Sequence, residues 1–239
     1  MNENQINFVL YSNLGIRSTF YKGTFANDEL NTKKINIPHL NTNKCFSFIV
    51  NSLTREENEK IGHWVAVYIR IEKNLKKIHI KFIDSYKQNY RVYGGGINNY
   101  IDRLRVLAFK NKFTFIFEET PFRTQASGSK TCGIYTIFGV ISLRKCSSIT
   151  LNRIFSKFTS YNRQKNDSIM VEYIIDVWPR RFCSDILSST NKKYVSFCPK
   201  KIFNSSKCLM ICRCNSGNIC CNTSRSSQYI RMKVSNLFI

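Results

Sequence analysis

The chain has 239 residues, of which 43% are apolar, 13% aromatic and 22% charged, a composition that can bury a core and excludes a disordered polymer. The 37 Lys and Arg residues outnumber the 15 Asp and Glu residues, and the net charge of +22 attracts polyanions such as nucleic acid. The sequence contains no run of about 18 apolar residues, so it does not predict a membrane span. The first residues, MNENQINFVLYSNLG, lack a basic segment followed by an apolar stretch, so they do not predict a secretory signal.

The ten cysteines and the charges are unevenly distributed along the chain. Six cysteines crowd the C-terminal end, all 15 acidic residues lie before residue 188, and residues 188–239 carry nine basic residues. A disulfide framework needs an oxidising compartment and usually a much smaller chain, so we expect reduced thiols. The sequence predicts a folded domain over 1–187 and a basic, Cys-rich extension over 188–239.

The first clear elements are two strands and a helix. The runs HWVAVYIRIE and KIHIKFIDSY flank a polar turn at 73–76 and predict a β-hairpin. After Gly94, Gly95 and Gly96, apolar residues at helical spacing predict a helix over 97–110. The glycines indicate a turn. A phosphate-binding loop needs a following Lys-Ser or Lys-Thr, which this sequence lacks here. The apolar positions of this helix are Ile97, Ile101, Leu104 and Leu107.

The rest of the first 187 residues alternates strand and helix. The run KFTFIFEE predicts a strand that ends before Pro121, and turn-forming residues then lead to a helix over 132–145 with one buried face. The run DSIMVEYIIDVWPRRF, residues 167–182, predicts a last amphipathic helix that Pro179 stops. Strands and helices together predict an α+β fold.

Cys132 lies where the predicted loop meets the predicted helix. Unpaired backbone N–H groups and the helix dipole favour thiolate over thiol at such a position. Cys132 is therefore a candidate nucleophile, and the alternative is a small apolar residue at the start of a core helix. An activated thiol needs a neighbouring base, and that base needs an orienting partner.

The predicted hairpin supplies a base and its partner. Pairing across the turn at 73–76 sets His63 beside Asp84 on one face. We expect the Asp84 carboxylate to hold the imidazole Nδ1–H, which leaves Nε2 to accept the thiol proton. His39, in a Pro-containing loop, and His79, with the opposite strand parity, fit this role less well. A packed structural histidine is the alternative for His63.

Gln125, seven residues before Cys132, completes the candidate site. When a thiolate attacks a carbonyl carbon, the carbonyl oxygen becomes an oxyanion that needs hydrogen-bond donors. The Gln125 side-chain N–H and the Cys132 backbone N–H can supply them.

These motifs, Gly-His-Trp, Ile-Asp-Ser and a Gln seven residues before Cys-Gly, resemble those of the adenain-type cysteine proteases of adenoviruses, virophages and Polinton-like elements. The resemblance runs from about Tyr21 to Leu143 and includes YKGTFANDEL and the Ile-Val-Asn segment before Gly-His-Trp. It implies a papain-like α+β fold with a central mixed sheet and a buried helix that carries the nucleophile. The residues it implies are the nucleophile Cys132, the base His63, the orienting Asp84 and the oxyanion residue Gln125.

The SUMO-deconjugating proteases share this residue order and form the rival family. They usually have Asp-Cys-Gly with the Gln six residues ahead. This chain has Thr131-Cys132-Gly133 with the Gln seven ahead, so the adenain type fits better.

The resemblance also implies a function. Enzymes of this type cleave capsid and core precursor proteins at Gly-Gly-like sites during virion maturation, and the charge suits double-stranded DNA as an activator. We expect a monomer that acts in the virion and in the host nucleus or cytoplasmic virus factory, needs no cofactor for its chemistry and contacts no membrane. An activating peptide is not expected, because Thr114 and its neighbours offer no cysteine for a disulfide. The alternatives are a deconjugase for ubiquitin-like modifiers and an inactive, basic DNA-binding virion protein.

The cysteines of 188–239 follow the spacing C-x9-C-x3-C-x-C-x5-C-C. Four such thiolates could bind zinc. The spacing lacks paired C-x-x-C motifs, and the extension has no His, so a disordered basic tail is the favoured prediction and zinc is the alternative.

Overall fold

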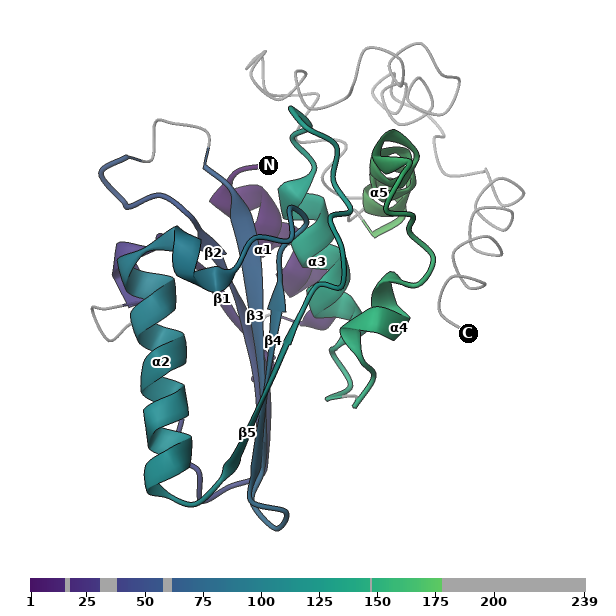
Figure 1. Ribbon diagram of the computed structural model, residues 1–239. Helices are drawn as coiled ribbons and strands as arrows, with labels where there is room; N and C mark the ends of the chain where they lie inside the picture. Colours follow the sequence, from purple (N-terminus) through teal and green to yellow (C-terminus); the bar gives the residue numbers. More distant parts are fainter. Residues whose placement is uncertain (16–17, 31–37, 58–61, 147, 178–239) are drawn as a thin grey trace. The chain divides into compact units, whose positions relative to one another are not determined.

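A five-stranded mixed sheet organises the computed structural model (Figure 1). The strands lie side by side in chain order, with antiparallel pairing in the middle and a parallel pair at each edge. The predicted α+β class with a central mixed sheet is confirmed. The strands are β1 (Tyr21–Phe25), β2 (Lys44–Asn51), β3 (Trp64–Glu72), β4 (Lys77–Ile83) and β5 (Thr114–Glu119).

The structure describes residues 1–15, 18–30, 38–57, 62–146 and 148–177. One compact unit spans Met1–Glu172, and a second begins at Tyr173. The predicted boundary at 187, the helix stop at Pro179 and the Cys-rich extension lie outside the described residues and stay predictions. No helix in the described ranges is long and apolar enough to cross a bilayer.

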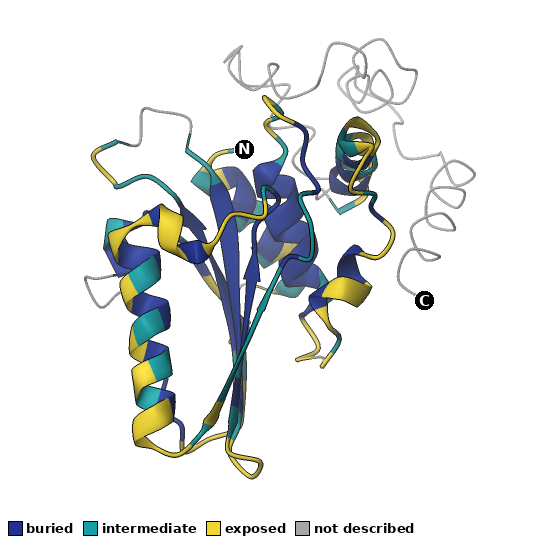
Figure 2. Ribbon diagram, viewed as in Figure 1, coloured by how far each residue is buried: buried dark blue, intermediate teal, exposed yellow. Residues whose placement is uncertain are grey.

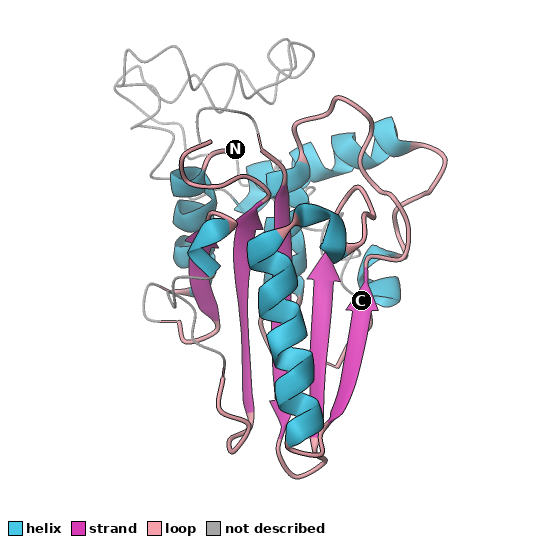
Figure 3. Cartoon of the chain, turned by 60° about the vertical axis from the view of Figure 1, so that its left-hand side comes forward, coloured by secondary structure: helices cyan, strands magenta, loops and turns pink. Residues whose placement is uncertain are grey.

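Helices cover both faces of the sheet (Figure 1, Figure 3). Helix α2 packs on one face, and α3 packs against β3 on the other face with α1 beside it. The central strands β2, β3 and β4 are mostly buried, whereas β5 at the edge is only partly buried (Figure 2). The helices are α1 (Glu3–Leu14), α2 (Gly95–Lys110), α3 (Cys132–Ser142), α4 (Leu151–Phe155) and α5 (Arg163–Val177), with short 3-10 turns at η1 (Asp28–Leu30) and η2 (Tyr90–Tyr93).

The predicted hairpin is β3 and β4. Its turn closes at 73–76, where the Lys76 N–H donates to the Lys73 carbonyl at 3.1 Å. Pairing runs from Glu72 opposite Lys77 to Ala66 opposite Ile83. The apolar residues that alternate along both strands pack against α2, which fixes the register, because a slip by one residue would turn them to the other face.

Helix α2 confirms the predicted helix and starts two residues earlier, at Gly95. Ile97, Ile101 and Leu104 are fully buried, and Leu107 is partly buried against the same core. The Ile97 N–H donates to Asn27 Oδ1 at 2.9 Å. A Cβ at Gly96 would lie 1.6 Å from the Asn27 carbonyl oxygen, so a glycine is needed where this helix start approaches the chain.

Helix α3 begins at Cys132 as predicted and ends at Ser142, three residues before the predicted end. The expectation of one buried face is wrong, because every residue from Cys132 to Ile141 is buried. The helix lies between β3 and α1, and Phe138 packs edge-on against Phe155 and Phe158 beyond it. A helix enclosed in this way has no solvent face for amphipathic patterning to mark.

The expectation of reduced thiols is wrong for one pair of cysteines. Cys45 in β2 and Cys146, just after α3, form a disulfide with their Cα atoms 5.7 Å apart. The two residues are separated by 101 positions, so the bond closes a long loop. Cys132 is a free, buried cysteine.

Replacing both Cys45 and Cys146 by Ser should lower the free energy of unfolding by about 2–4 kcal/mol, because the cross-link restricts the unfolded chain. Urea denaturation followed by circular dichroism measures this change. Dithiothreitol should lower the stability of the wild type to that of the double variant and leave the variant unchanged. An equal effect of the reductant on both proteins would contradict a stabilising bond at this position.

Candidate active site

His63 and Asp84 meet at the open end of the hairpin. His63 Nε2 lies 2.7 Å from Asp84 Oδ1, and the Asp84 side chain is only 1% exposed. The expectation that Nδ1 would face the carboxylate is therefore wrong. Because Ala66 pairs with Ile83, the register sets Asp84 level with Val65, two residues beyond His63, and the far nitrogen of the ring makes the contact. Nδ1 is left for the thiol.

The Asp84 carboxylate is held by four donors. Oδ1 accepts from His63 and from the Tyr86 backbone N–H at 2.8 Å, and Oδ2 accepts from the Gln88 N–H and the Tyr93 hydroxyl at 2.7 Å each. Burial raises the pKa of Asp84, but the His63 hydrogen bond and charge and the Tyr93 and Tyr86 bonds outweigh it, and the net pKa is lowered. Asp84 is therefore an ionised, fixed acceptor.

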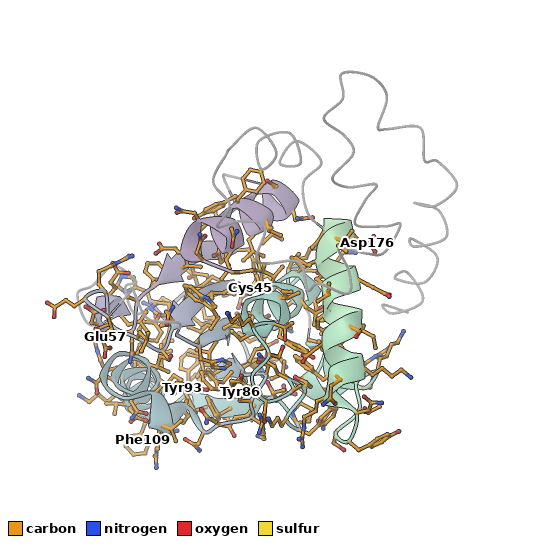
Figure 4. The ribbon with its side chains drawn as sticks, turned by 90° about the horizontal axis from the view of Figure 1, so that it is seen from above. Cys45, Glu57, Tyr86, Tyr93, Phe109 and Asp176 are labelled. Carbon is orange, nitrogen blue, oxygen red and sulfur yellow. A yellow bond between two sulfur atoms is a disulfide. The ribbon has the colours of Figure 1, made fainter. Side chains whose placement is uncertain are left out.

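Two tyrosine rings lie along the His63 imidazole. They belong to Tyr86 and Tyr93, whose side chains are labelled in Figure 4. The Tyr86 ring stacks at 4.6 Å between centroids with a 24° tilt, and the Tyr93 ring lies at 5.9 Å with a 17° tilt. Burial and then the Asp84 charge raise the pKa of Tyr93, so its hydroxyl stays protonated and donates. The sequence interpretation missed both tyrosines, since no spacing rule ties them to His63.

Cys132 and His63 interact, and each shifts the pKa of the other. Burial raises the pKa of the Cys132 thiol, but the His63 bond and charge, followed by the Trp64 backbone N–H, bring it below its ordinary value. Burial lowers the pKa of His63, whereas the bonds to Asp84 and Cys132 raise it, with a net rise from 6.5 to about 9. The pair therefore favours thiolate and imidazolium, the reactive form of a cysteine nucleophile.

Gln125 is completely buried, and its side-chain amide has a fixed orientation. Its Oε1 accepts from the Ser85 hydroxyl at 2.5 Å, and its Nε2 donates to the Ser129 carbonyl at 2.7 Å. The Ser85 carbonyl also accepts the Gln125 backbone N–H at 3.1 Å. The amide nitrogen thus faces the loop that leads to Cys132 and has a second N–H to offer.

The other histidines of the described chain lie apart from this site. His39 is exposed, and His79 bonds to Glu72 at 3.1 Å. No group of three potential ligands within the described residues could hold a metal ion. Sequence interpretation also missed Ser85, which orients Gln125, and Asp167, which bonds to the loop before Cys132. The Ser of Ile-Asp-Ser was the available signal for the former.

The site combines a thiol, a base, a buried carboxylate and an amide donor, the groups that cysteine proteases use. No family model and no curated protein matches the chain. In fold it is similar to two crystal structures of an ASFV protease, at 16% and 14% identity and TM-scores of 0.38 and 0.44, over 53% and 71% of this chain and 42% and 68% of those chains. A de-sumoylating protease is 14% identical with a TM-score of 0.38, over 73% of this chain and 83% of that one. The chain thus spans less than half of the first of these structures, and the likeness is one of fold alone.

Alkylation of Cys132 should report its lowered pKa. The rate of modification by iodoacetamide follows the thiolate fraction, so in the wild type its midpoint should lie below the ordinary thiol pKa of 9.0. In His63→Ala the burial remains and the stabilising bond is lost, so the midpoint should move above that value. Mass spectrometry of the Cys132 peptide against pH measures both midpoints. Coincident midpoints would show that His63 does not lower the thiol pKa.

The ion pair of His63 and Asp84 should make stability depend on pH. A histidine with a raised pKa stabilises the fold fully below its unfolded value of 6.5 and loses that contribution as pH rises through about 9. Asp84→Asn should therefore lower the free energy of unfolding by on the order of 3 kcal/mol at pH 6 and by clearly less at pH 10. Denaturation midpoints of both proteins across this range test the window. A deficit that is constant with pH would contradict a charged pair.

Proposed function

We propose that this chain is a cysteine endopeptidase. One observation carries the proposal: His63 Nε2 contacts the buried Asp84 at 2.7 Å, and the same histidine lowers the pKa of the free thiol of Cys132 at the first position of α3. A nucleophile, a base and an orienting carboxylate connected in series define this class of catalysis on unrelated folds.

The mechanism follows from these contacts. The Cys132 thiolate attacks the carbonyl carbon of the scissile bond, and the His63 imidazolium then protonates the leaving amine. The oxyanion accepts hydrogen bonds from the Cys132 backbone N–H and from the free N–H of Gln125. Neutral His63 next takes a proton from water, and the hydroxide releases the acyl group from the thioester. Asp84 holds the ring in place throughout, and no step draws on a cofactor.

The substrates we propose are capsid and core precursor proteins of a virus, cleaved at Gly-Gly-like sites during virion maturation. The motif resemblance from Tyr21 to Leu143 supports this assignment, and the net charge of +22 supports double-stranded DNA as a platform that concentrates enzyme and substrate. The enzyme would act as a monomer in the virion and in the infected cell, in the nucleus or a cytoplasmic virus factory. Zinc binding by the cysteines of 188–239 is a lesser alternative that this proposal does not require.

Hydrolysis of fluorogenic peptides centred on Gly-Gly and Gly-Ala tests the proposal. The wild type should cleave a subset of them, Cys132→Ala should cleave none, and Gln125→Ala should lose about 10²–10³-fold in kcat because one oxyanion donor is gone. Double-stranded DNA should raise the rate at low salt and lose this effect at moderate salt.

Three outcomes would contradict this proposal. Rapid labelling of Cys132 by a ubiquitin-like protein aldehyde, with no peptide cleavage, would identify a deconjugase. Cleavage that persists in Cys132→Ala would exclude Cys132 as the nucleophile. A folded protein that binds DNA but neither cleaves peptides nor reacts with the aldehyde would identify an inactive DNA-binding component.

A further inference from the structure

The loop between Gln125 and Cys132 is held by helix α5 through one carboxylate. Asp167 Oδ1 accepts from the Thr131 hydroxyl at 2.8 Å, and Oδ2 accepts from the Ala126 backbone N–H at 3.1 Å. Thr131 directly precedes Cys132, and Ala126 directly follows Gln125. Asp167 therefore connects the two ends of the loop that separates the proposed oxyanion donors.

Neighbouring contacts make this connection rigid. Oδ1 of Asp167 also accepts from the Tyr135 hydroxyl at 3.1 Å, one turn into α3. Burial and then the Asp167 charge raise the pKa of Tyr135, so that hydroxyl stays protonated and donates. Asn166, which is 1% exposed, donates to the Thr124 carbonyl at 3.0 Å and to the Thr159 carbonyl at 2.7 Å. Helix α5 is thus fixed to both the loop and the nucleophile helix.

The geometry of an oxyanion hole depends on the spacing of its donors. One proposed donor is the Cys132 backbone N–H, in the peptide unit that Thr131 begins, and the other is the Gln125 amide. Preorganised donors stabilise the transition state only when they point at the position of the developing charge. A carboxylate that binds both flanking residues sets that spacing without contact with the substrate.

We propose that Asp167 is a positioning residue that aligns the two oxyanion donors, a role that rests on the proposed peptidase function. It acts on the transition state and not on the thiolate, since Cys132 owes its lowered pKa to His63 and Trp64. Loss of Asp167 should therefore separate two properties of the site: the stabilisation of the oxyanion and the reactivity of the thiol.

The test compares full-length wild type, Asp167→Ala, Asp167→Asn and the control Glu172→Gln, which removes an exposed carboxylate from the same helix. Three quantities are measured: kcat and KM on a cleaved peptide, the inhibition constant of a peptide aldehyde ending in glycinal, and the rate of iodoacetamide alkylation at Cys132. The aldehyde forms a hemithioacetal whose oxygen occupies the oxyanion site, whereas alkylation needs only the thiolate.

In Asp167→Ala we expect kcat to fall about 10- to 100-fold with KM within about threefold, and aldehyde affinity to fall by a similar factor. Alkylation should stay within about twofold of the wild type. Asp167→Asn keeps one oxygen that can accept from the Thr131 hydroxyl, but its NH2 group replaces the oxygen that accepts from the Ala126 N–H. Its losses should therefore be intermediate. Glu172→Gln should match the wild type in all three measurements.

Thr131→Val gives an independent test from the other end of the same hydrogen bond. It should weaken aldehyde binding. Its effect should not add to that of Asp167→Ala, because both variants remove the same hydrogen bond between Thr131 and Asp167. Thermal denaturation of each variant identifies any that fails to fold. Unchanged aldehyde affinity in a folded Asp167→Ala, or an equal loss of alkylation, would overturn the positioning role. A wild-type Cys132 no more reactive than free cysteine would instead refute the peptidase function.

Discussion

The buried carboxylate of Asp84 is the constraint on which the rest of the site depends. A charge with 1% of its side chain exposed is stable only when it is neutralised and hydrogen-bonded on all sides. Four donors meet this requirement, and three of them come from the segment 86–93 that follows it. The chain between β4 and α2 therefore wraps around the carboxylate, and the remaining position is left for His63.

A series of hydrogen bonds connects the end of β4 to the loop before the nucleophile. Asp84 orients the base, and the next residue, Ser85, orients the Gln125 amide through its hydroxyl. The loop from Gln125 to Cys132 is then fixed from its other side by α5. Every group assigned a chemical role is thus held by a neighbour whose own position comes from regular structure, which is how preorganised sites reach their precision.

Local patterning predicted β3, β4, β5, α2, α3 and α5, because each has a turn signal or an apolar period of its own. It missed β1, β2, α1 and α4. Strand β2 is buried on both faces and shows no alternation, and α1 has no clear apolar period, because the partly buried Phe8 stands next to the buried Val9. The residues of the candidate site followed from motifs, whereas the ring nitrogen that meets Asp84 depends on a two-residue offset in register. The contact from Tyr93 and the bond between Cys45 and Cys146 depend on tertiary folding that no sequence interval encodes.

Helix α3 joins two sulfur chemistries that require opposite surroundings. Its first residue must remain a free thiolate to act, while Cys146, four residues past its end, is oxidised and bonded to β2. Reducing conditions protect the first and favour opening of the second, whereas oxidising conditions preserve the second and threaten the first. The redox potential of the solution therefore affects the reactive thiol and the stabilising disulfide in opposite directions. The protein keeps both only within a limited range of potential.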